Sequence, residues 1–492
     1  MSGTKLAPTT GPKSRRRIPI HRSANMTSAT LLREISEFCR QAGLAESTFG
    51  RLVVNDGKFV NRLREGGSVT EQTLERVRKY IARETPKHRD GKPVMGQVQA
   101  NVVAKASSAN PTIDAENNFR FYDNRQKYLM FVNTCSEKWV VAHRVTEELK
   151  SIQPRPPAFR MFDAGVGDGT VLTRVMRTMH SRFDMMPFYI VAKEISLEDV
   201  RLALEKMPDR FFEHPATVLV MTNMNYAEAP WLQPANLNKA STMVWHEAPL
   251  RGSTSAEFDE QIAELQPFLA DAWKAGVDPK TGNPVYEKPA VLVLYREDCR
   301  FLLDSVIPRR GAVRADYDLV IASQPYRARA STQFKAKRVI APLARSLAPG
   351  GRLLGIHSCG HDPALEIVQK VWPGEEPFQT TRHDLLAATK VELGKAARSF
   401  NFTAGADNKA VFRYDMHTLP GEIETDNASI GTSTLFAAWN DAAYVAQIED
   451  QRLEDAMRDD GYLKATREVL KKHGGLWFND ESFIISRKRE LI

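Results

Sequence analysis

Cysteine is scarce in this sequence, and no hydrophobic run is long. The 492 residues include four cysteines, Cys39, Cys135, Cys299 and Cys359, and no two of them form a CxxC pair. This spacing argues against a disulfide framework or a zinc site and fits reduced thiols in the cytosol. No segment approaches the roughly 18 consecutive apolar residues of a membrane span, and the N-terminus lacks the apolar core of a secretory signal. We therefore expect a soluble, cytoplasmic protein with no metal and no membrane partner.

Positive charge is concentrated at the front of the chain. Residues 1–105 contain 20 Lys and Arg against 9 Asp and Glu, whereas the rest of the chain contains 48 against 51. A basic segment joined to a nearly neutral one predicts that a polyanion such as DNA would meet the N-terminal part. A solubilising tail is the alternative for the first 25 residues.

Composition and periodicity divide the chain into four segments. The first is polar and rich in Arg, Pro and Ser, and it has too little apolar content to fold. In the second, apolar residues recur at helical spacing between glycine-containing breaks, which predicts four short helices. The third has several prolines and no periodicity. The predicted segments are a disordered basic tail (1–28), a small all-α domain (29–82), a linker (83–117) and a large domain (118–492).

The large domain alternates short apolar runs with longer helical stretches. This alternation is typical of βαβ units and predicts an α/β fold with a mostly parallel sheet. The long interval between the third and fourth strands, about 230–313, is interpreted as an insertion. Seven strands are predicted, at 159–162, 189–192, 217–220, 319–322, 353–356, 410–413 and 482–485.

A glycine-rich turn follows the first predicted strand. It reads Asp163-Ala164-Gly165-Val166-Gly167-Asp168-Gly169, and a helical pattern begins at once after it. Glycines at such a turn let the backbone approach a ligand closely, and the start of the following helix offers unpaired N–H groups. The spacing is G-x-G-x-G after an acidic residue, not the G-x-G-x-x-G of dinucleotide-binding folds, so an NAD-dependent oxidoreductase is disfavoured.

This turn resembles the first motif of class I S-adenosylmethionine-dependent methyltransferases. The resemblance covers roughly residues 120–490 and implies a Rossmann-like, seven-stranded sheet that binds S-adenosylmethionine. It implies that the turn wraps the amino acid part of the cofactor, that an acid after the second strand binds the ribose, and that an amide after the third strand contacts adenine. The cofactor residues implied are Asp163, Gly165, Gly167, Gly169, Glu194 and Asn223. Tyr128, upstream of the first strand, would close over the cofactor or else pack in the core.

Candidate catalytic residues follow the fourth and fifth strands. Ser323-Gln324-Pro325-Tyr326 resembles the Asn/Asp-Pro-Pro-Tyr motif of amino methyltransferases, but it differs at the first two positions. His357, directly after the fifth predicted strand, is either a base that faces the substrate or a structural histidine. Methyl transfer requires alignment, and it requires a base only when the acceptor must lose a proton. Ser323, Tyr326 and His357 are therefore the predicted catalytic residues.

The basic N-terminal domain resembles a repressor-type helix-turn-helix domain. Residues 35–54 place apolar positions on either side of Gly43, as two packed helices with a tight turn require. Outward polar residues of such helices contact phosphates or base edges. The candidates are Ser47, Thr48 and Arg51 in one register and Lys58, Arg62 and Arg64 in a second. RNA binding, partner docking and a purely structural bundle are the alternatives.

Two functions from different classes are consistent with these features. The first is a methyltransferase that uses S-adenosylmethionine and places its acceptor over the ends of the fourth and fifth strands. The second is a DNA-binding regulator whose methyltransferase-like domain senses a ligand or mediates assembly. No motif identifies the methyl acceptor, so a small metabolite, a lipid headgroup, a protein and a nucleic acid all remain open.

Overall fold

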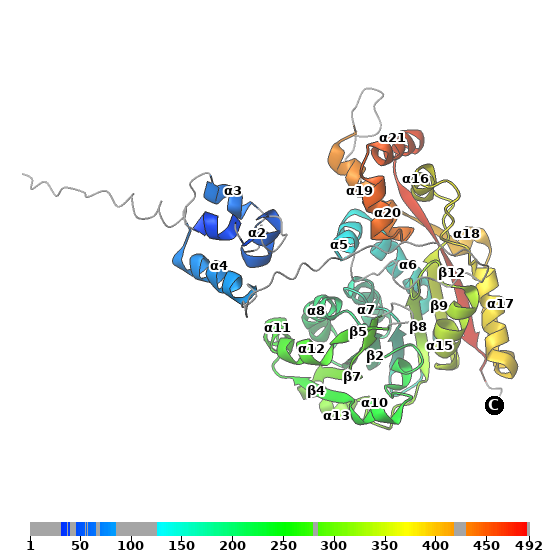
Figure 1. Cartoon of the computed structure of the whole chain (residues 1–492). Helices are drawn as coiled ribbons and strands as arrows, with labels where there is room; N and C mark the ends of the chain where they lie inside the picture. Colours follow the sequence, from blue (N-terminus) through cyan, green and yellow to red (C-terminus); the bar gives the residue numbers. More distant parts are fainter. Residues whose placement is uncertain are drawn as a thin grey trace, which may run out of the picture. The chain divides into compact units, whose positions relative to one another are not determined.

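The chain divides into two compact units, Met1–Ala109 and Asn110–Ile492 (Figure 1). The computed structural model describes residues 31–36, 38–39, 46–54, 56, 58–64, 69–84, 125–278, 284–417 and 430–489. The predicted tail (1–28) and nearly all of the predicted linker (83–117) lie outside the described residues. Among the described residues, no helix is both long enough and apolar enough to cross a membrane.

The first unit is helical where it is described, and it has its own core. Residues 31–36 and 38–39 are helical, and three further helices follow: α2 (Glu46–Val54), α3 (Phe59–Arg64) and α4 (Glu71–Glu84). The apolar positions that give the sequence its helical period are buried in one cluster, as helices packed on one another require. Its buried residues include Leu31, Ile35, Phe38, Phe49, Val60 and Val77.

A ten-stranded sheet forms the centre of the second unit. Its strands are ordered β10-β12-β9-β8-β1-β2-β3-β7-β4, and β11 pairs with β12 beside this path. Strands β1, β2, β3, β8 and β9 are mutually parallel, while β12 runs antiparallel to β9 and β7 runs antiparallel to β3. The bounds are β1 Phe159–Asp163, β2 Phe188–Lys193, β3 Thr217–Thr222, β4 Val244–Leu250, β7 Ala290–Arg296, β8 Tyr317–Ser323, β9 Leu347–Ser358, β10 Phe400–Thr403, β11 Val411–Asp415 and β12 Trp477–Arg487.

The prediction of seven strands is wrong in number. Six of the seven predicted segments lie in strands, and 410–413 does so from Val411 onward, because Ala410 ends a short helix; three further strands join the sheet. Two of them, β4 and β7, come from the insertion and extend the sheet beyond β3, and the third, β10, pairs with the end of β12. The insertion is thus part of the sheet itself. A separate hairpin in it, β5 (Ala275–Val277) and β6 (Pro284–Tyr286), forms a small second sheet.

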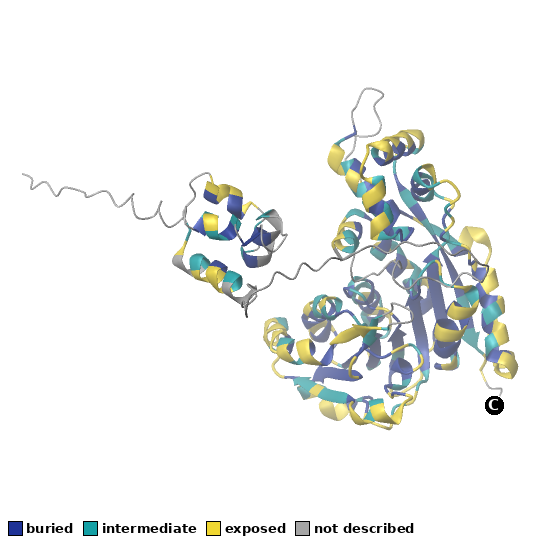
Figure 2. Ribbon diagram, viewed as in Figure 1, coloured by how far each residue is buried: buried dark blue, intermediate teal, exposed yellow. Residues whose placement is uncertain are grey.

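Helices cover both faces of the sheet (Figure 1). Strand β2 shows why, because Phe188, Ile190 and Ala192 join one core cluster while Tyr189 and Val191 join the other. Alternate side chains of a strand point to opposite faces, so a strand that is apolar throughout needs cover on both. The central strands are accordingly buried, and the exposed residues lie mainly on the outer helices (Figure 2).

Three groups of helices provide this cover. The first face is covered by α6 (Glu137–Leu149), α7 (Thr170–Arg182), α8 (Leu197–Glu205), α9 (Pro208–Glu213), α11 (Ser255–Ala263) and α12 (Gln266–Ala272). The second is covered by α13 (Arg300–Leu303), a π-helical turn at Ala336–Ile340, α15 (Ala341–Arg345) and α17 (Arg382–Leu393). A third core joins the first half of β12 to α5 (Arg125–Thr134), α16 (Pro363–Val371), α19 (Thr432–Val445), α20 (Asp450–Ala456) and α21 (Gly461–His473).

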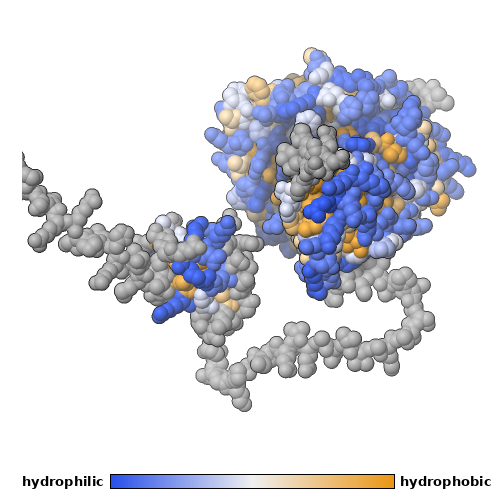
Figure 3. Space-filling view, turned by 90° about the horizontal axis from the view of Figure 1, so that it is seen from above, coloured by the Kyte–Doolittle hydropathy of each residue, from blue (hydrophilic) through white to orange (hydrophobic). Residues whose placement is uncertain are grey.

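The remaining helices are short connections. They are α10 (Leu237–Ser241), α14 (Thr332–Lys335) and α18 (Asp407–Ala410). The surface seen from above is mostly hydrophilic, with apolar residues in scattered groups (Figure 3). Scattered apolar residues are ordinary on folded proteins and identify no docking surface by themselves.

Candidate active site

The order of the parallel strands marks one edge of the sheet as a ligand site. Strand β1 lies between β2 and β8, so the chain runs outward from β1 to β3 on one side and then resumes at β8 on the other. In open α/β sheets, ligands bind outside the carboxyl ends of the strands where the order reverses in this way. The structure therefore brings the loops after β1 and β8 together at the expected crevice.

The glycine turn occupies this position, and its three glycines have different roles. Gly167 and Gly169 have positive φ angles of 53° and 78°. A Cβ atom on Gly169 would lie 2.8 Å from the Cα of Ala203 in α8, so this glycine allows the turn and α8 to pack closely. A Cβ on Gly165 would meet no atom within 4 Å. Gly165 thus borders open space beside the end of β1, as a ligand that approaches the backbone requires.

Two acidic side chains meet at the turn. One carboxylate oxygen of Glu194 accepts a hydrogen bond from the Gly167 N–H at 3.0 Å, and the other accepts from the N–H groups of Ile195 and Ser196. Asp163 accepts from the Gly165 N–H at 3.2 Å. Burial raises the pKa of Asp163 to about 6, and the negative charge of Glu194 adds to the effect. Two acids so close together favour a cationic ligand or one rich in hydroxyl groups.

The N-terminal helices of the second unit close over this turn. A Cβ on Gly167 would lie 3.2 Å from the phenol oxygen of Tyr128 in α5, so Tyr128 contacts the turn as its position in the sequence suggested. Lys138 of α6 lies 5.6 Å from the centre of the Tyr128 ring. The sequence pattern gave no reason to select Lys138, because its neighbours at the turn come from α5 and from the loop after β1.

Asn223 lies after β3 as predicted, but its amide is already used. Its nitrogen donates to the carbonyl oxygens of Ala272 and Lys288, and its oxygen accepts from the Ala290 N–H at 2.8 Å. Both N–H donors of the amide are therefore taken by the insertion. Asn223 ties the insertion to the end of β3, and it has no donor left for an adenine ring.

The insertion also reaches the acidic pair. The indole nitrogen of Trp273, at the end of α12, donates to the backbone oxygen of Glu194 at 2.9 Å. Trp273 is buried in the same core as α8. The sequence alone could not assign this contact, because 79 residues separate the two partners.

The segment after β8 is held in place by the strands beside it. Ser323 is half-buried at the end of β8. Gln324 has a φ of 47°, and its amide nitrogen donates to both carboxylate oxygens of Asp480 at 3.2 Å. The Pro325 carbonyl accepts from the Tyr226 hydroxyl at 2.7 Å. The Pro325 carbonyl is thus bonded to the protein itself.

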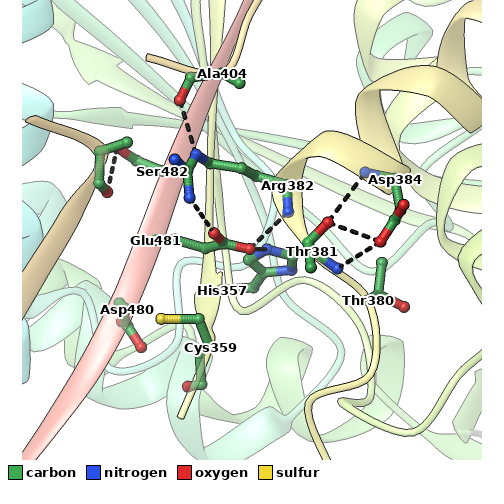
Figure 4. A network of polar contacts seen from close by, with 12 residues as sticks. His357, Cys359, Thr380, Thr381, Arg382, Asp384, Ala404, Asp480, Glu481 and Ser482 are labelled. Carbon is green, nitrogen blue, oxygen red and sulfur yellow. Dashed lines mark hydrogen bonds and ion pairs between the residues drawn. The ribbon is translucent and has the colours of Figure 1, made fainter. Parts of the chain in front are cut away.

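Tyr326 and His357 belong to a buried chain of polar groups. The Tyr326 hydroxyl lies 3.0 Å from Nδ1 of His357. On the other side of the imidazole, Nε2 of His357 lies 2.9 Å from a carboxylate oxygen of Glu481 (Figure 4). Arg382 donates to Glu481 both from its backbone N–H, at 2.6 Å, and from its guanidinium, at 2.7 Å. Two predicted catalytic residues are thus in direct contact, and each has little exposed surface.

These hydrogen bonds fix the protonation state of the buried polar groups. Although burial opposes it, hydrogen bonds from His357 and Arg382 hold the pKa of Glu481 below its ordinary value. An ionised carboxylate only accepts hydrogen bonds, so Nε2 of His357 must carry the proton and Nδ1 must accept from Tyr326. Burial lowers the pKa of His357, which favours the neutral imidazole. A neutral histidine oriented in this way can act as a base through the tyrosine.

The sequence did not reveal Glu481 or Arg382, which come from β12 and the start of α17. Glu481 is separated from His357 by 124 positions and is brought beside it by the antiparallel pairing of β9 and β12. Charged residues in an apolar strand would have been the available signal. Asp480 and Glu481 interrupt the hydrophobic pattern of β12, and both are buried.

Comparisons with known proteins give structural matches only. No family model and no curated protein matches the chain. It is similar to a protein described as a sarcosine dimethylglycine methyltransferase from Galdieria sulphuraria, with 9% identity over 72% of this chain and 86% of that chain and a TM-score of 0.27. A class I S-adenosylmethionine-dependent methyltransferase from Listeria monocytogenes matches with 9% identity over 95% of this chain and 90% of that chain, at a TM-score of 0.24.

An rRNA methyltransferase from Streptomyces viridochromogenes also matches, with 12% identity over 44% of this chain and 72% of that chain and a TM-score of 0.18. All three neighbours are described as methyltransferases. The strand order and the contacts at the site are the features that bear on function.

The N-terminal unit gives no support to the predicted DNA-binding surface. Ser47, Thr48 and Arg51 lie in α2, and the predicted turn at Gly43 lies outside the described residues. Lys58 is exposed before α3. Arg62 forms an ion pair with Asp56, and Arg64 pairs with Glu46 at 2.6 Å. Two of the candidate cations thus have carboxylate partners within the unit, which lowers the charge they offer to a phosphate.

Proposed function

We propose that the second unit is an S-adenosylmethionine-dependent methyltransferase. The observation that supports this most directly is the turn after β1, in which Gly165 borders open space while Asp163 and Glu194 lie at the strand ends beside it. S-adenosylmethionine carries an ammonium group, a sulfonium centre and two ribose hydroxyls. A pair of carboxylates next to exposed backbone suits these groups better than it suits the pyrophosphate of a dinucleotide.

The residues of the turn have separate tasks in this proposal. Asp163 attracts the cationic amino acid part of the cofactor, and Gly165 leaves room for it against the backbone. Glu194 holds the turn through the Gly167 N–H and accepts hydrogen bonds from ribose hydroxyls. When bound, the cofactor supplies an electrophilic methyl group. Tyr128 and Lys138 cover the turn and keep water from it.

The acceptor is proposed to lie over the ends of β8 and β9. Ser323 ends β8, Tyr326 follows it and His357 is close to the end of β9, at the same edge of the sheet as the turn. Tyr226 lies near both places. Its hydroxyl donates to the Pro325 carbonyl, and burial, together with the negative charges of Glu194 and Asp163, raises its pKa. Methyl transfer needs the acceptor and the methyl group aligned, and these loops provide a fixed frame for that alignment.

Calorimetry can test the cofactor site directly. We expect S-adenosylmethionine and S-adenosylhomocysteine to bind the full chain, NAD to give no binding heat, and Asp163→Ala and Glu194→Ala each to weaken binding by about tenfold or more, since each removes a charged hydrogen-bonding group. Glu205→Ala, at an exposed position of α8, is the matched control and should bind as the wild type does.

Two results would contradict the proposed function. One is a folded wild type that binds neither cofactor form. The other is an equal loss of affinity in the Glu205→Ala control, which would mean that net charge and not the turn determines binding.

A further inference from the structure

A buried lysine lies beside the Tyr326–His357 pair. Lys335, the last residue of α14, has 2% of its surface exposed. Its ammonium donates to the Ala328 carbonyl at 2.7 Å and lies 5.2 Å from the centre of the Tyr326 ring. Within the described part of the chain, no carboxylate forms an ion pair with Lys335. Burial lowers the pKa of this lysine to about 8, so at neutral pH it is largely a cation without a counter-charge.

A buried ammonium without a counter-charge lowers the free energy of unfolding unless a bound anion compensates its charge. An ammonium can donate three hydrogen bonds, and the carbonyl of Ala328 satisfies one of them. A buried lysine with a perturbed pKa marks a candidate functional site, and its remaining N–H donors are free to pair with an anion.

The lysine and the tyrosine border one small cavity. The cavity measures about 10 Å³, which is room for about one water molecule. Its polar wall includes Tyr326, Lys335, His357 and Thr380, and Phe378 and Val445 form an apolar side. The space thus fits a single oxygen atom, with the remainder of a molecule against the apolar side chains or beyond them.

The polar wall combines a cation with a path for a proton. The Tyr326 hydroxyl hydrogen bonds to Nδ1 of His357, and Glu481 and Arg382 fix the other side of the imidazole. A carboxylate acceptor needs no base, and an amine would be repelled by the ammonium of Lys335. A hydroxyl acceptor is the class that uses both features, because it must lose a proton and it becomes an anion when it does so.

We infer that the methyl acceptor is an acidic hydroxyl, phenolic or enolic, whose oxygen enters this cavity, with Lys335 as its counter-charge and the Tyr326–His357 pair as its proton path. The inference deepens the proposed function and rests on it. The acceptor oxygen gives its proton to Tyr326 while Tyr326 passes its own proton to Nδ1 of His357, and the imidazolium that forms is stabilised by Glu481. A lone pair of the oxygen forms the new C–O bond to the methyl carbon, and the C–S electron pair stays on the sulfur that leaves as a thioether.

The ionisation of a bound phenol tests this inference without turnover. The probe is 4-nitrophenol, whose phenolate has its own absorbance band, added over a range of pH to the full chain saturated with S-adenosylhomocysteine. We expect the ionisation constant of the dye to rise by about tenfold on binding, because Lys335 favours the phenolate. Lys335→Met should abolish this rise, and Lys335→Arg, which keeps the charge, should retain part of it.

Lys337→Met is the matched control, because Lys337 is exposed two positions further along the same segment. It should leave the ionisation constant of the bound dye as in the wild type. The inference is overturned if the wild type fails to bind the dye, if it binds the dye without a rise in ionisation, or if Lys335→Met retains the rise. Binding of S-adenosylhomocysteine is measured first in every variant, and its loss in the wild type would count against the proposed function instead.

Discussion

Asp163 shows at the scale of one residue how function opposes stability. Its carboxyl is buried next to a second acid, so its ionised form is unfavourable in the folded chain. A cationic ligand would relieve this cost, which is the usual sign of a binding residue and not of a structural one. The same reasoning applies to Lys335, whose charge is also buried and has no carboxylate partner among the described residues.

The substitution Asp163→Asn should therefore stabilise the ligand-free protein at neutral pH. The folded pKa of about 6 lies above the ordinary value of 3.8, so the contribution of this carboxyl is fully present below pH 3.8 and is lost as the pH rises through 6. That shift corresponds to about 3 kcal/mol. Denaturant unfolding should show the variant gaining up to this amount over the wild type between those pH values. If the unfolding free energies of the variant and the wild type differ by the same amount at all pH values, Asp163 does not ionise with a raised pKa in the folded chain.

At the scale of elements, the contact between the glycine turn and α8 fixes the floor of the site. Gly169 is the N-cap of α7 and packs against Ala203, so it sets the distance between two helices of the same layer. The motif predicted the turn correctly, and the structure adds that its third glycine serves packing. The acidic residue after β2 leads directly into α8, so the position of that helix also orients Glu194.

Gly169→Ala should destabilise the protein more than the left-handed backbone alone explains. Gly311 is the matched control, because it has the same φ of 78° and a Cβ there would meet no atom within 4 Å. Gly311→Ala should cost about 1–2 kcal/mol, which is the conformational penalty. Gly169→Ala should cost a further 1–3 kcal/mol or so for overpacking and should weaken cofactor binding. Thermal unfolding and calorimetry measure both effects, and equal costs at the two positions would rule out close packing as the role of Gly169.

At the scale of the whole molecule, the two units have separate cores. The core of the first unit contains no residue beyond Val77 among its buried members, and the three cores of the second begin at Phe131 or later. The proposed active site lies within the second unit.

Matched core substitutions should separate the two units. Phe49 and Phe258 are both fully buried, one in each unit. Each Phe→Ala change should cost about 3–5 kcal/mol in its own unit. In calorimetric melting, Phe49→Ala should lower one transition and leave cofactor affinity unchanged, whereas Phe258→Ala should lower the other. A single transition that both variants shift equally would mean that the units unfold together.

The sequence by itself determined the local features of this protein. Helical and strand periods, the glycine turn and the acid after the second strand depend on near neighbours, and the structure has the predicted turn and a strand at each of the seven predicted places, although Ala410 lies just outside its strand. Only the tertiary structure decided the rest. The insertion joins the sheet, and Asn223 is used by that insertion. Glu481 bonds to His357, and Lys335, Tyr326 and His357 line one cavity. These contacts join residues far apart in the chain, and their energy depends on burial and pairing that no local pattern encodes.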